Sequence, residues 1–281
     1  MSTKIDLSQW VGRRVERFDV VNPNHLAAWN ATLDRDDPFP RDGDPVAPPF
    51  QWALFPPVTR QSDLGPDGHP RRGGFLPPIE LPRRMWAGSR LRFLAPLRVG
   101  ERVEQVSEIA RVEEKQGRAG ALVFVTVRHT TSGASGPAIE EEQDLVYRGI
   151  PPRGAAPAPA ERAPRGAWHR EIAPDATLLF RFSALTFNGH RIHYDLKYAT
   201  AEESYPGLVV HGPLLATLLL DLVRRERRDA AVERFQFKAL RPTFDTSPFT
   251  LEGDPDGDRH VKLWSTDNHG ATAVEAEAWT R

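Results

Sequence analysis

Residues 213–228 constrain the fold of this chain more than any other segment. They begin Pro-Leu-Leu-Ala-Thr-Leu-Leu-Leu-Asp-Leu-Val and end among arginines, so apolar side chains cover most of the circumference of a helix for about three turns. Proline in the first turn and arginine in the last turn suit the unpaired backbone groups and the dipole of such a helix. A helix that is apolar nearly all round must be buried, and we expect a strongly curved antiparallel sheet to hold it.

A segment rich in proline and alanine divides the chain into two parts of similar size. Residues 150–167 lack apolar periodicity and carry prolines at short intervals, which is typical of an extended connector. The 281 residues are enough for two domains that each bury a core. We therefore predict an N-terminal domain over residues 1–149, a connector over 150–167 and a C-terminal domain over 168–281.

The two halves share a pattern of strands. A basic strand over residues 89–97 in the first half resembles the segment 235–244 in the second. Alternating or β-branched residues predict further strands over residues 102–112, 121–129, 261–266 and 271–279. Both halves thus end as antiparallel meanders, which indicates an internal duplication. The first half has drifted, because prolines bound its segment 48–57 and allow only a short helix there.

Composition excludes several classes of function. Lysine plus arginine (37) nearly balances aspartate plus glutamate (38), so no overall positive field would draw the chain onto nucleic acid or an anionic membrane. The absence of cysteine excludes disulfides, thiolate metal sites and thiol nucleophiles. Residues 1–7 lack the apolar core of a signal peptide, and no apolar run approaches the length that spans a membrane, so we expect a cytoplasmic protein.

The segment 182–195 carries the chemistry. It reads Phe-Ser-Ala-Leu-Thr-Phe-Asn-Gly-His-Arg-Ile-His-Tyr-Asp and so combines two histidines, an asparagine and a carboxylate. A little further on, residues 205–213 read Tyr-Pro-Gly-Leu-Val-Val-His-Gly-Pro and open the apolar helix. We expect a proton-transfer cluster and a helix N-terminus to meet in one site, which indicates an enzyme that acts on a carbonyl compound.

Read without gaps, this segment resembles the signature of the MaoC-like, hot-dog-fold enoyl-thioester hydratases. Aromatic, aliphatic, small and histidine positions of the signature are matched by Phe182, Leu185, Thr186, Ile192, His193 and Ala199. Three positions depart from it: Phe187 stands for the glycine, Asn188 for the aspartate, and His190-Arg191 for an Asn-Pro pair. The loss of the aspartate leaves the usual acid/base assignment open.

The whole chain is most similar to the double-hot-dog subgroup of these hydratases. That subgroup includes mesaconyl-C4-CoA hydratase, itaconyl-CoA hydratase and type 2 hydroxyacyl-thioester dehydratase, and the resemblance is specific over residues 178–245. It implies an α+β double hot-dog, with two curved antiparallel sheets that each wrap a central helix, the N-terminal one degenerate.

The resemblance also implies an activity, a reversible hydration of a short branched or dicarboxylic 2-enoyl-CoA. Itaconyl-CoA or mesaconyl-C4-CoA, giving citramalyl-CoA, are the sharpest expectations. No cofactor is implied, because CoA is part of the acyl-CoA thioester substrate. Two fused repeats form a pseudo-dimer, and this architecture is compatible with further pairing into a homo-oligomer.

Three residues are the candidate catalytic groups. His193 can accept and return a proton near neutrality, since an ordinary histidine has a pKa of about 6.5. Gly212 can present its N–H to the thioester oxygen at the positive end of the buried helix, and glycine lets a substrate approach closely. Asn188 is a neutral amide that cannot act as a base, so its expected role is to orient the water or the thioester.

Supporting roles are open for three further side chains. Asp195, two residues past His193, and Asp34, in a faint echo of the motif, could each orient His193 or share its proton. Either acid is as readily a helix cap or a solvated surface group. His190 could hydrogen-bond the substrate or support Asn188.

Arginines near these segments are candidates for binding CoA phosphates and a substrate carboxylate. They are Arg181, Arg191 and Arg241, and Arg191 is favoured for the carboxylate because it lies between the two histidines. A metal is not expected, because His190, His193 and Asp195 find no third ligand motif elsewhere in the sequence.

Three other functions stay open at this stage. They are dehydration of 3-hydroxyacyl thioesters in fatty-acid metabolism, noncatalytic binding of acyl-CoA, and thioester hydrolysis, since hot-dog folds host several chemistries. No phosphate loop or dinucleotide fingerprint occurs, so nucleotide cofactors are not implied.

Overall fold

The strands of the two halves form one continuous antiparallel sheet in the computed structural model, which describes residues 6–117, 120–150 and 160–281. The first half contributes β1 (Arg14–Val20), β2 (Arg83–Phe93), β3 (Arg102–Gly117), β4 (Gly120–Gly133) and β5 (Gly136–Arg148). The second half contributes β6 (Trp168–Ile172), β7 (Val232–Ala239), β8 (Phe249–Asp256), β9 (His260–Thr266) and β10 (Thr272–Thr280). Every predicted strand overlaps one of these ranges, but the predicted segments 89–97 and 235–244 run past the ends of β2 and β7 into the following turns.

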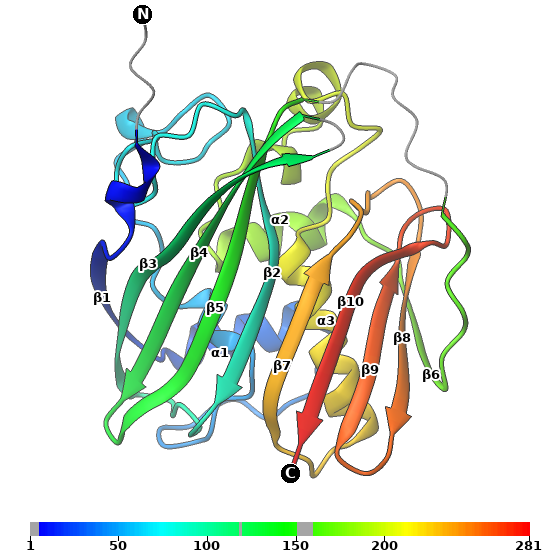
Figure 1. Cartoon of the computed structure of the whole chain (residues 1–281). Helices are drawn as coiled ribbons and strands as arrows, with labels where there is room; N and C mark the ends of the chain where they lie inside the picture. The colour runs from blue at the N-terminus through cyan, green and yellow to red at the C-terminus, as the bar shows by residue number, and fades with distance from the viewer. Residues whose placement is uncertain (1–5, 118–119, 151–159) are drawn as a thin grey trace, which may run out of the picture.

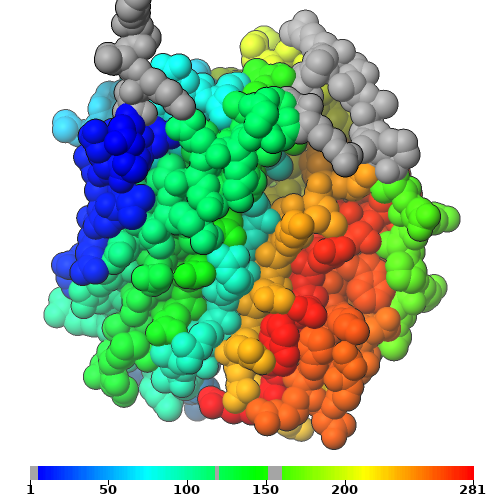
Figure 2. All heavy atoms as spheres, viewed as in Figure 1, coloured from blue at the N-terminus to red at the C-terminus, as the bar shows by residue number. Residues whose placement is uncertain are grey.

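The same topology occurs twice in this sheet. The order is β1-β3-β4-β5-β2 followed by β7-β10-β9-β8-β6, so each half places its first, third, fourth, fifth and second strand in sequence from its outer edge inward. The halves join where β2 pairs with β7, with Ser89 opposite Phe237 and Leu91 opposite Phe235. Figures 1 and 2 show the strands of both halves side by side on one face. The repeated order supports the internal duplication.

One long helix, α3 (Gly212–Glu226), lies behind the strands of the second half (Figure 1). Every residue from Leu214 to Val223 is buried, which agrees with the apolar pattern of this segment. In the corresponding stretch of the first half, between the first helix and β2, the structure has only two short 3₁₀ helices, η2 (Phe50–Ala53) and η3 (Gln61–Asp63). The double hot-dog with a degenerate N-terminal repeat is therefore confirmed, and its two sheets are joined edge to edge.

Two shorter helices, α1 (Pro23–Thr32) and α2 (Ala176–Leu185), pack against each other between the repeats. Asn22 and Asp175 begin them, each accepting hydrogen bonds from backbone N–H groups of the first turn. The rings of Trp29 and Phe182 lie 5.5 Å apart at their contact. The two repeats thus share one apolar core.

The C-terminal part of the connector follows the edge of the second repeat. Arg162 forms an isolated antiparallel bridge with Ala271, and the Trp264 indole N–H donates to the Pro164 carbonyl at 3.1 Å. The rest of the predicted connector, residues 151–159, lies outside the described residues, so the domain boundaries stay a prediction. Within the described ranges, none of the helices has the length and hydrophobicity needed to cross a lipid bilayer.

A buried carboxylate on α3 ties three segments together. Asp221 is 0% exposed and accepts from Arg35 at 2.7 Å, from Arg170 at 3.0 Å and from Arg225 at 2.7 Å. Arg35 follows α1, whereas Arg170 lies on β6. This cluster fixes the C-terminal part of α3 against both repeats.

We expect the substitution Asp221→Asn to destabilise the fold by about 3 kcal/mol, because it removes the charge that three arginines share in a buried place. The free energy of unfolding in urea measures this loss. Glu233→Gln is the control, since Glu233 pairs with the well-exposed Arg259 at 3.1 Å and its loss should stay within about 0.5 kcal/mol. Equal losses in both variants would contradict the structural role of Asp221.

Candidate active site

His193 is held in one orientation at the end of the 3₁₀ turn η4 (Arg191–His193). Its Nδ1–H donates to the Val209 carbonyl at 2.7 Å, so in the neutral ring Nε2 carries the lone pair. The side chain is buried, and this burial lowers the pKa of His193 to about 4. The imidazole is therefore neutral near pH 7 and able to accept a proton.

A second imidazole packs against the His193 ring. His211, which is 0% exposed, stacks on His193 with ring centroids 3.6 Å apart and an interplanar angle of 18°. Its Nε2 is 2.9 Å from the hydroxyl of Ser183 on α2. Burial, together with the neighbouring His193, lowers the pKa of His211 well below its ordinary value. His211 thus stays neutral and positions His193.

The N-terminus of α3 lies immediately after His211 in the chain. No side chain caps this helix, and no acceptor among the described residues bonds the Gly212 N–H. A Cβ added to Gly212 would meet only the Trp86 carbonyl oxygen, at 3.9 Å. An unpaired N–H at the positive end of a buried helix, with space in front of it, suits a carbonyl oxygen that gains negative charge.

A loop of the first repeat docks against this segment. The Arg191 N–H donates to the Asp67 carbonyl at 2.9 Å. Gly68, with φ +88°, lies so close to Gly189 that an added Cβ would overlap the Gly189 carbonyl oxygen. Only glycine suits that backbone conformation and that close approach, so the loop is built to place its neighbours at the site.

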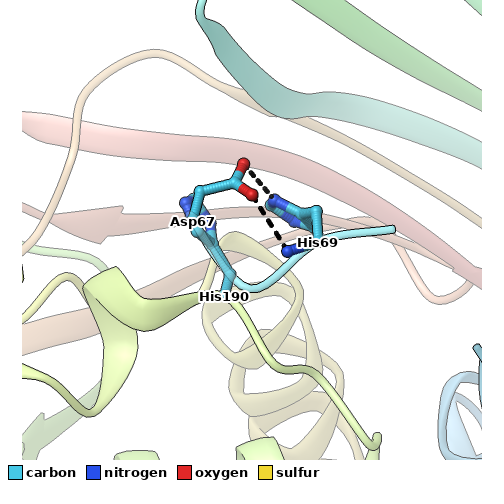
Figure 3. A group of neighbouring side chains, drawn as sticks. All are labelled: Asp67, His69 and His190. Atoms are coloured by element: carbon cyan, nitrogen blue, oxygen red, sulfur yellow. Dashed lines mark hydrogen bonds and ion pairs between the residues drawn. The ribbon is translucent and has the colours of Figure 1, made fainter. Parts of the chain in front are cut away.

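Those neighbours are Asp67 and His69. The Asp67 carboxylate accepts from the His69 N–H and from His69 Nδ1, each at 3.0 Å (Figure 3). The His69 ring lies 4.1 Å from the His190 ring, which in turn meets His193 edge-on at 5.4 Å. Burial and the neighbouring histidines lower the pKa of His190 to about 2. Four imidazoles thus form a row from the loop to the start of α3.

This row includes a set of donors that could bind a metal. One ligand atom each from Asp67, His69 and His190 lie within 4.8 Å of one another. The sequence argument against a metal, which found no third donor, is wrong in this respect because two donors come from the other repeat. The surroundings disfavour a cation, since Arg84 and Arg72 act with burial to lower the pKa of His69 and would repel a metal ion as well.

Three of the predicted residues have local partners. The Asn188 Oδ1 accepts from the His190 N–H at 3.0 Å, so this oxygen shapes the turn. Asp195 accepts from the Arg191 guanidinium at 2.7 and 3.0 Å, and that guanidinium also stacks over Tyr198 at 4.2 Å. Arg191 and Asp195 neutralise each other beside the site.

The structure does not bring Asp34 and Arg181 to His193. Both line a hollow that opens beside Leu218, about halfway along α3, and Asp34 is largely exposed there, 4.0 Å from Arg170. Asp34 does echo the motif in position, because it follows α1 with φ 53° as Phe187 follows α2 with φ 49°.

Arg241, the remaining predicted arginine, lies in the turn after β7. Two residues further on, the Thr243 carbonyl accepts the Val210 N–H at 2.8 Å, so this turn runs beside the segment that enters α3.

Sequence reasoning missed Asp67, His69, His211, Ser183 and Arg84. His211 lies inside a segment that the sequence singles out, but nothing there indicates stacking on His193. The Asp-Gly-His-Pro stretch at 67–70 was the available signal, since a histidine and an acid in a long loop without periodicity are often functional.

A double hot-dog with a buried histidine beside an uncapped helix N-terminus is typical of hot-dog-fold hydratases and dehydratases. Comparison with known proteins agrees. The model of the hydroxyacyl-thioester dehydratase type 2 family matches residues 49–245, which is most of the chain. This protein belongs to that family and is a hydro-lyase.

Individual relatives cover nearly the whole chain. A mesaconyl-C(4)-CoA hydratase of Chloroflexus aurantiacus is 46% identical over 272 residues and 96% of each chain. The mitochondrial hydroxyacyl-thioester dehydratase type 2 of Schizosaccharomyces pombe is 26% identical over 95% of each chain. The crystal structure of a MaoC-like dehydratase from Phytophthora capsici superposes with a TM-score of 0.72, at 13% identity and 99% coverage of both chains, and supports the fold.

We expect Gly68→Ala to undock the loop that carries Asp67 and His69. The added Cβ overlaps the Gly189 carbonyl, so the Arg191 amide should exchange with solvent at least about tenfold faster. Gly43→Ala is the matched control. Gly43 has φ +87° and open space around it, so this substitution introduces backbone strain but no overlap with a neighbour. Unchanged exchange at Arg191 in the Gly68 variant would contradict the docking.

Proposed function

We propose that the protein catalyses the reversible hydration of a short branched or dicarboxylic 2-enoyl-CoA. Mesaconyl-C4-CoA is the leading substrate and itaconyl-CoA the second, each giving citramalyl-CoA. One observation carries the proposal: the lone pair of His193 Nε2 and the unpaired Gly212 N–H belong to adjacent segments at the start of α3. The 46% identity to a mesaconyl-C(4)-CoA hydratase supports this choice of substrate.

In the mechanism proposed for mesaconyl-C4-CoA, the Gly212 N–H hydrogen-bonds the thioester oxygen and polarises the conjugated double bond. In itaconyl-CoA the double bond lies one carbon further from the thioester, so its hydration would place the proton on the terminal methylene carbon instead of the α-carbon. His193 Nε2 takes a proton from a water molecule as its oxygen attacks the β-carbon, and the π electrons move onto the thioester to form an enolate. The His193 imidazolium then returns the proton to the α-carbon, which restores the enzyme. Asn188 Nδ2 is left to orient the substrate. We propose no cofactor, because CoA is part of the substrate.

A dicarboxylic acyl group requires a cation near the histidines, and Arg84 is our candidate for it. Arg84 lies on β2 two residues before Trp86, so both project from the same face of the strand. Its charge acts on both His69 and His190, which places it beside the row of imidazoles. Among the described residues no carboxylate forms an ion pair with Arg84, whereas Arg191 is paired with Asp195.

The second candidate function is dehydration of linear 3-hydroxyacyl thioesters. The family description and the Schizosaccharomyces pombe relative favour it, and the acid/base chemistry at His193 would be the same in reverse. The two functions differ in the acyl group, so substrate preference separates them.

The first test is hydration of mesaconyl-C4-CoA, crotonyl-CoA and itaconyl-CoA. Loss of the conjugated enoyl-thioester absorbance measures the first two reactions, and chromatographic detection of citramalyl-CoA measures the third, because the double bond of itaconyl-CoA is not conjugated with the thioester. We expect the dicarboxylic substrates to be preferred and His193→Gln to lower kcat at least about 10²-fold, because the base is lost. Preference for crotonyl-CoA would favour the second candidate. Release of free CoA thiol would identify a thioesterase, and binding without turnover a noncatalytic protein.

We further expect Arg84→Gln to raise the KM for mesaconyl-C4-CoA about 10- to 100-fold, since a charge-assisted hydrogen bond is lost, and to leave crotonyl-CoA hydration nearly unchanged. Arg191→Gln is the comparison. It should leave the ratio of the two activities unaltered, because Asp195 already neutralises Arg191. A changed ratio in the Arg191 variant, with none in the Arg84 variant, would return the carboxylate to Arg191.

A further inference from the structure

We propose that His69, oriented by Asp67, is a second acceptor for the reacting water, which the first repeat supplies in place of the aspartate missing at position 188. His193 removes one proton of this water and returns it to the α-carbon, whereas His69 Nε2 accepts a hydrogen bond from the other hydrogen, which stays on the product hydroxyl. The inference rests on the proposed hydration and names a further residue for that reaction.

The first step is the orientation of His69. Both carboxylate oxygens of Asp67 are engaged with it, one on the backbone N–H and the other on Nδ1, at 3.0 Å each. Nδ1 therefore carries the hydrogen, and Nε2 keeps the lone pair. A histidine fixed in this way by a carboxylate, with its far nitrogen unprotonated, can accept a hydrogen bond from a water molecule at that nitrogen.

The second step is the position of this pair beside His190, which Figure 3 shows. Ligand atoms of Asp67, His69 and His190 lie within 4.8 Å of one another. The His69 ring lies 4.1 Å from the His190 ring, so one water can contact both imidazoles with hydrogen bonds of about 2.8 Å. The His190 ring meets the His193 ring edge-on at 5.4 Å, so we place the reacting water in the row that contains the proposed base.

The third step is that the other polar side chains predicted for this role are already engaged. Asn188 uses its Oδ1 in a turn, and Asp195 is paired with Arg191. Asp67 remains as a carboxylate in direct contact with the histidine row. The motif's missing acid is therefore matched in space by a residue from the other repeat.

The charges around the pair keep His69 in the form that accepts a hydrogen bond. Burial raises the pKa of Asp67, but the two hydrogen bonds that it accepts from His69 outweigh this effect, and the net pKa lies well below the ordinary value. Burial and Arg84 lower the pKa of His69, and Asp67 opposes them. At neutral pH the carboxylate is ionised and the imidazole is uncharged, as an acceptor requires.

The test compares His69→Gln and Asp67→Asn with the wild-type enzyme on its best enoyl-CoA. We expect His69→Gln to lower kcat about 10²- to 10⁴-fold with little change in KM. Asp67→Asn should lower kcat less and move the acid limb of the kcat/KM profile to lower pH. The shift has this direction because Asp67 raises the pKa of His69. Without Asp67 the pKa of His69 falls, so the imidazole stays unprotonated down to a lower pH.

The chain offers a matched control pair, Asp256 and His260. Their side chains meet at 3.3 Å on β8 and β9, remote from the histidine row in sequence and exposed at Asp256. His260→Gln and Asp256→Asn should leave kcat and the pH profile as in the wild type. A pure folding defect in the Asp67 variant would reduce activity at every pH without moving the acid limb.

Other outcomes would contradict either the role of His69 or the proposed hydratase function. Wild-type kcat in His69→Gln, or an unmoved acid limb in Asp67→Asn, overturns the inference while the hydratase function stands. A wild-type enzyme that hydrates no enoyl-CoA overturns the proposed function itself. Activity that is lost on dialysis against EDTA and restored by Zn²⁺ would make Asp67, His69 and His190 a metal site, and would also overturn the inference.

Discussion

Burial of α3 is the constraint on which the rest of this structure depends. A helix that is apolar on nearly every side has to be enclosed, and five strands of the second repeat curve round it. The first repeat has only short 3₁₀ helices in the corresponding stretch, so it has no comparable helix of its own to bury. It completes its core by packing α1 against α2 and by pairing β2 with β7. One repeat thus provides the helix, and the other closes the molecule around it.

This division of labour places the candidate active site at the junction of the repeats. The start of α3 is uncapped and Gly212 is partly buried, which leaves the Gly212 N–H for a ligand, since helix N-terminal N–H groups need an acceptor. His211 directly precedes that helix, and His193, from η4, stacks on the His211 ring. The loop of the first repeat then adds Asp67 and His69 by close contact between two glycines. The first repeat therefore contributes residues to the candidate site although it lacks a central helix.

Electrostatics explain how so many histidines can gather in one place. Burial lowers the pKa of each of the four imidazoles, so they are neutral together and do not repel one another. Charged side chains lie at the end of the row formed by His69 and His190. There the Asp67 carboxylate contacts His69, and the Arg84 guanidinium acts on both histidines. A proton taken up during catalysis would meet an anion there, and an anionic substrate would meet a cation.

The sequence by itself determined the elements that local pattern controls. The apolar run predicted α3 and, with it, the glycine at the helix N-terminus. Alternation predicted strands in both halves, and the motif register picked out His193. The partners of these residues were decided only by the tertiary structure. Arg191 has the charge that a substrate carboxylate needs and lies beside the histidines, but in the fold it forms an ion pair with Asp195. Asp67 and His69 lie more than a hundred residues before the motif in a loop without periodicity, and only packing between the repeats brings them to His190, because such contacts depend on the shape of the assembled core rather than on spacing along the chain.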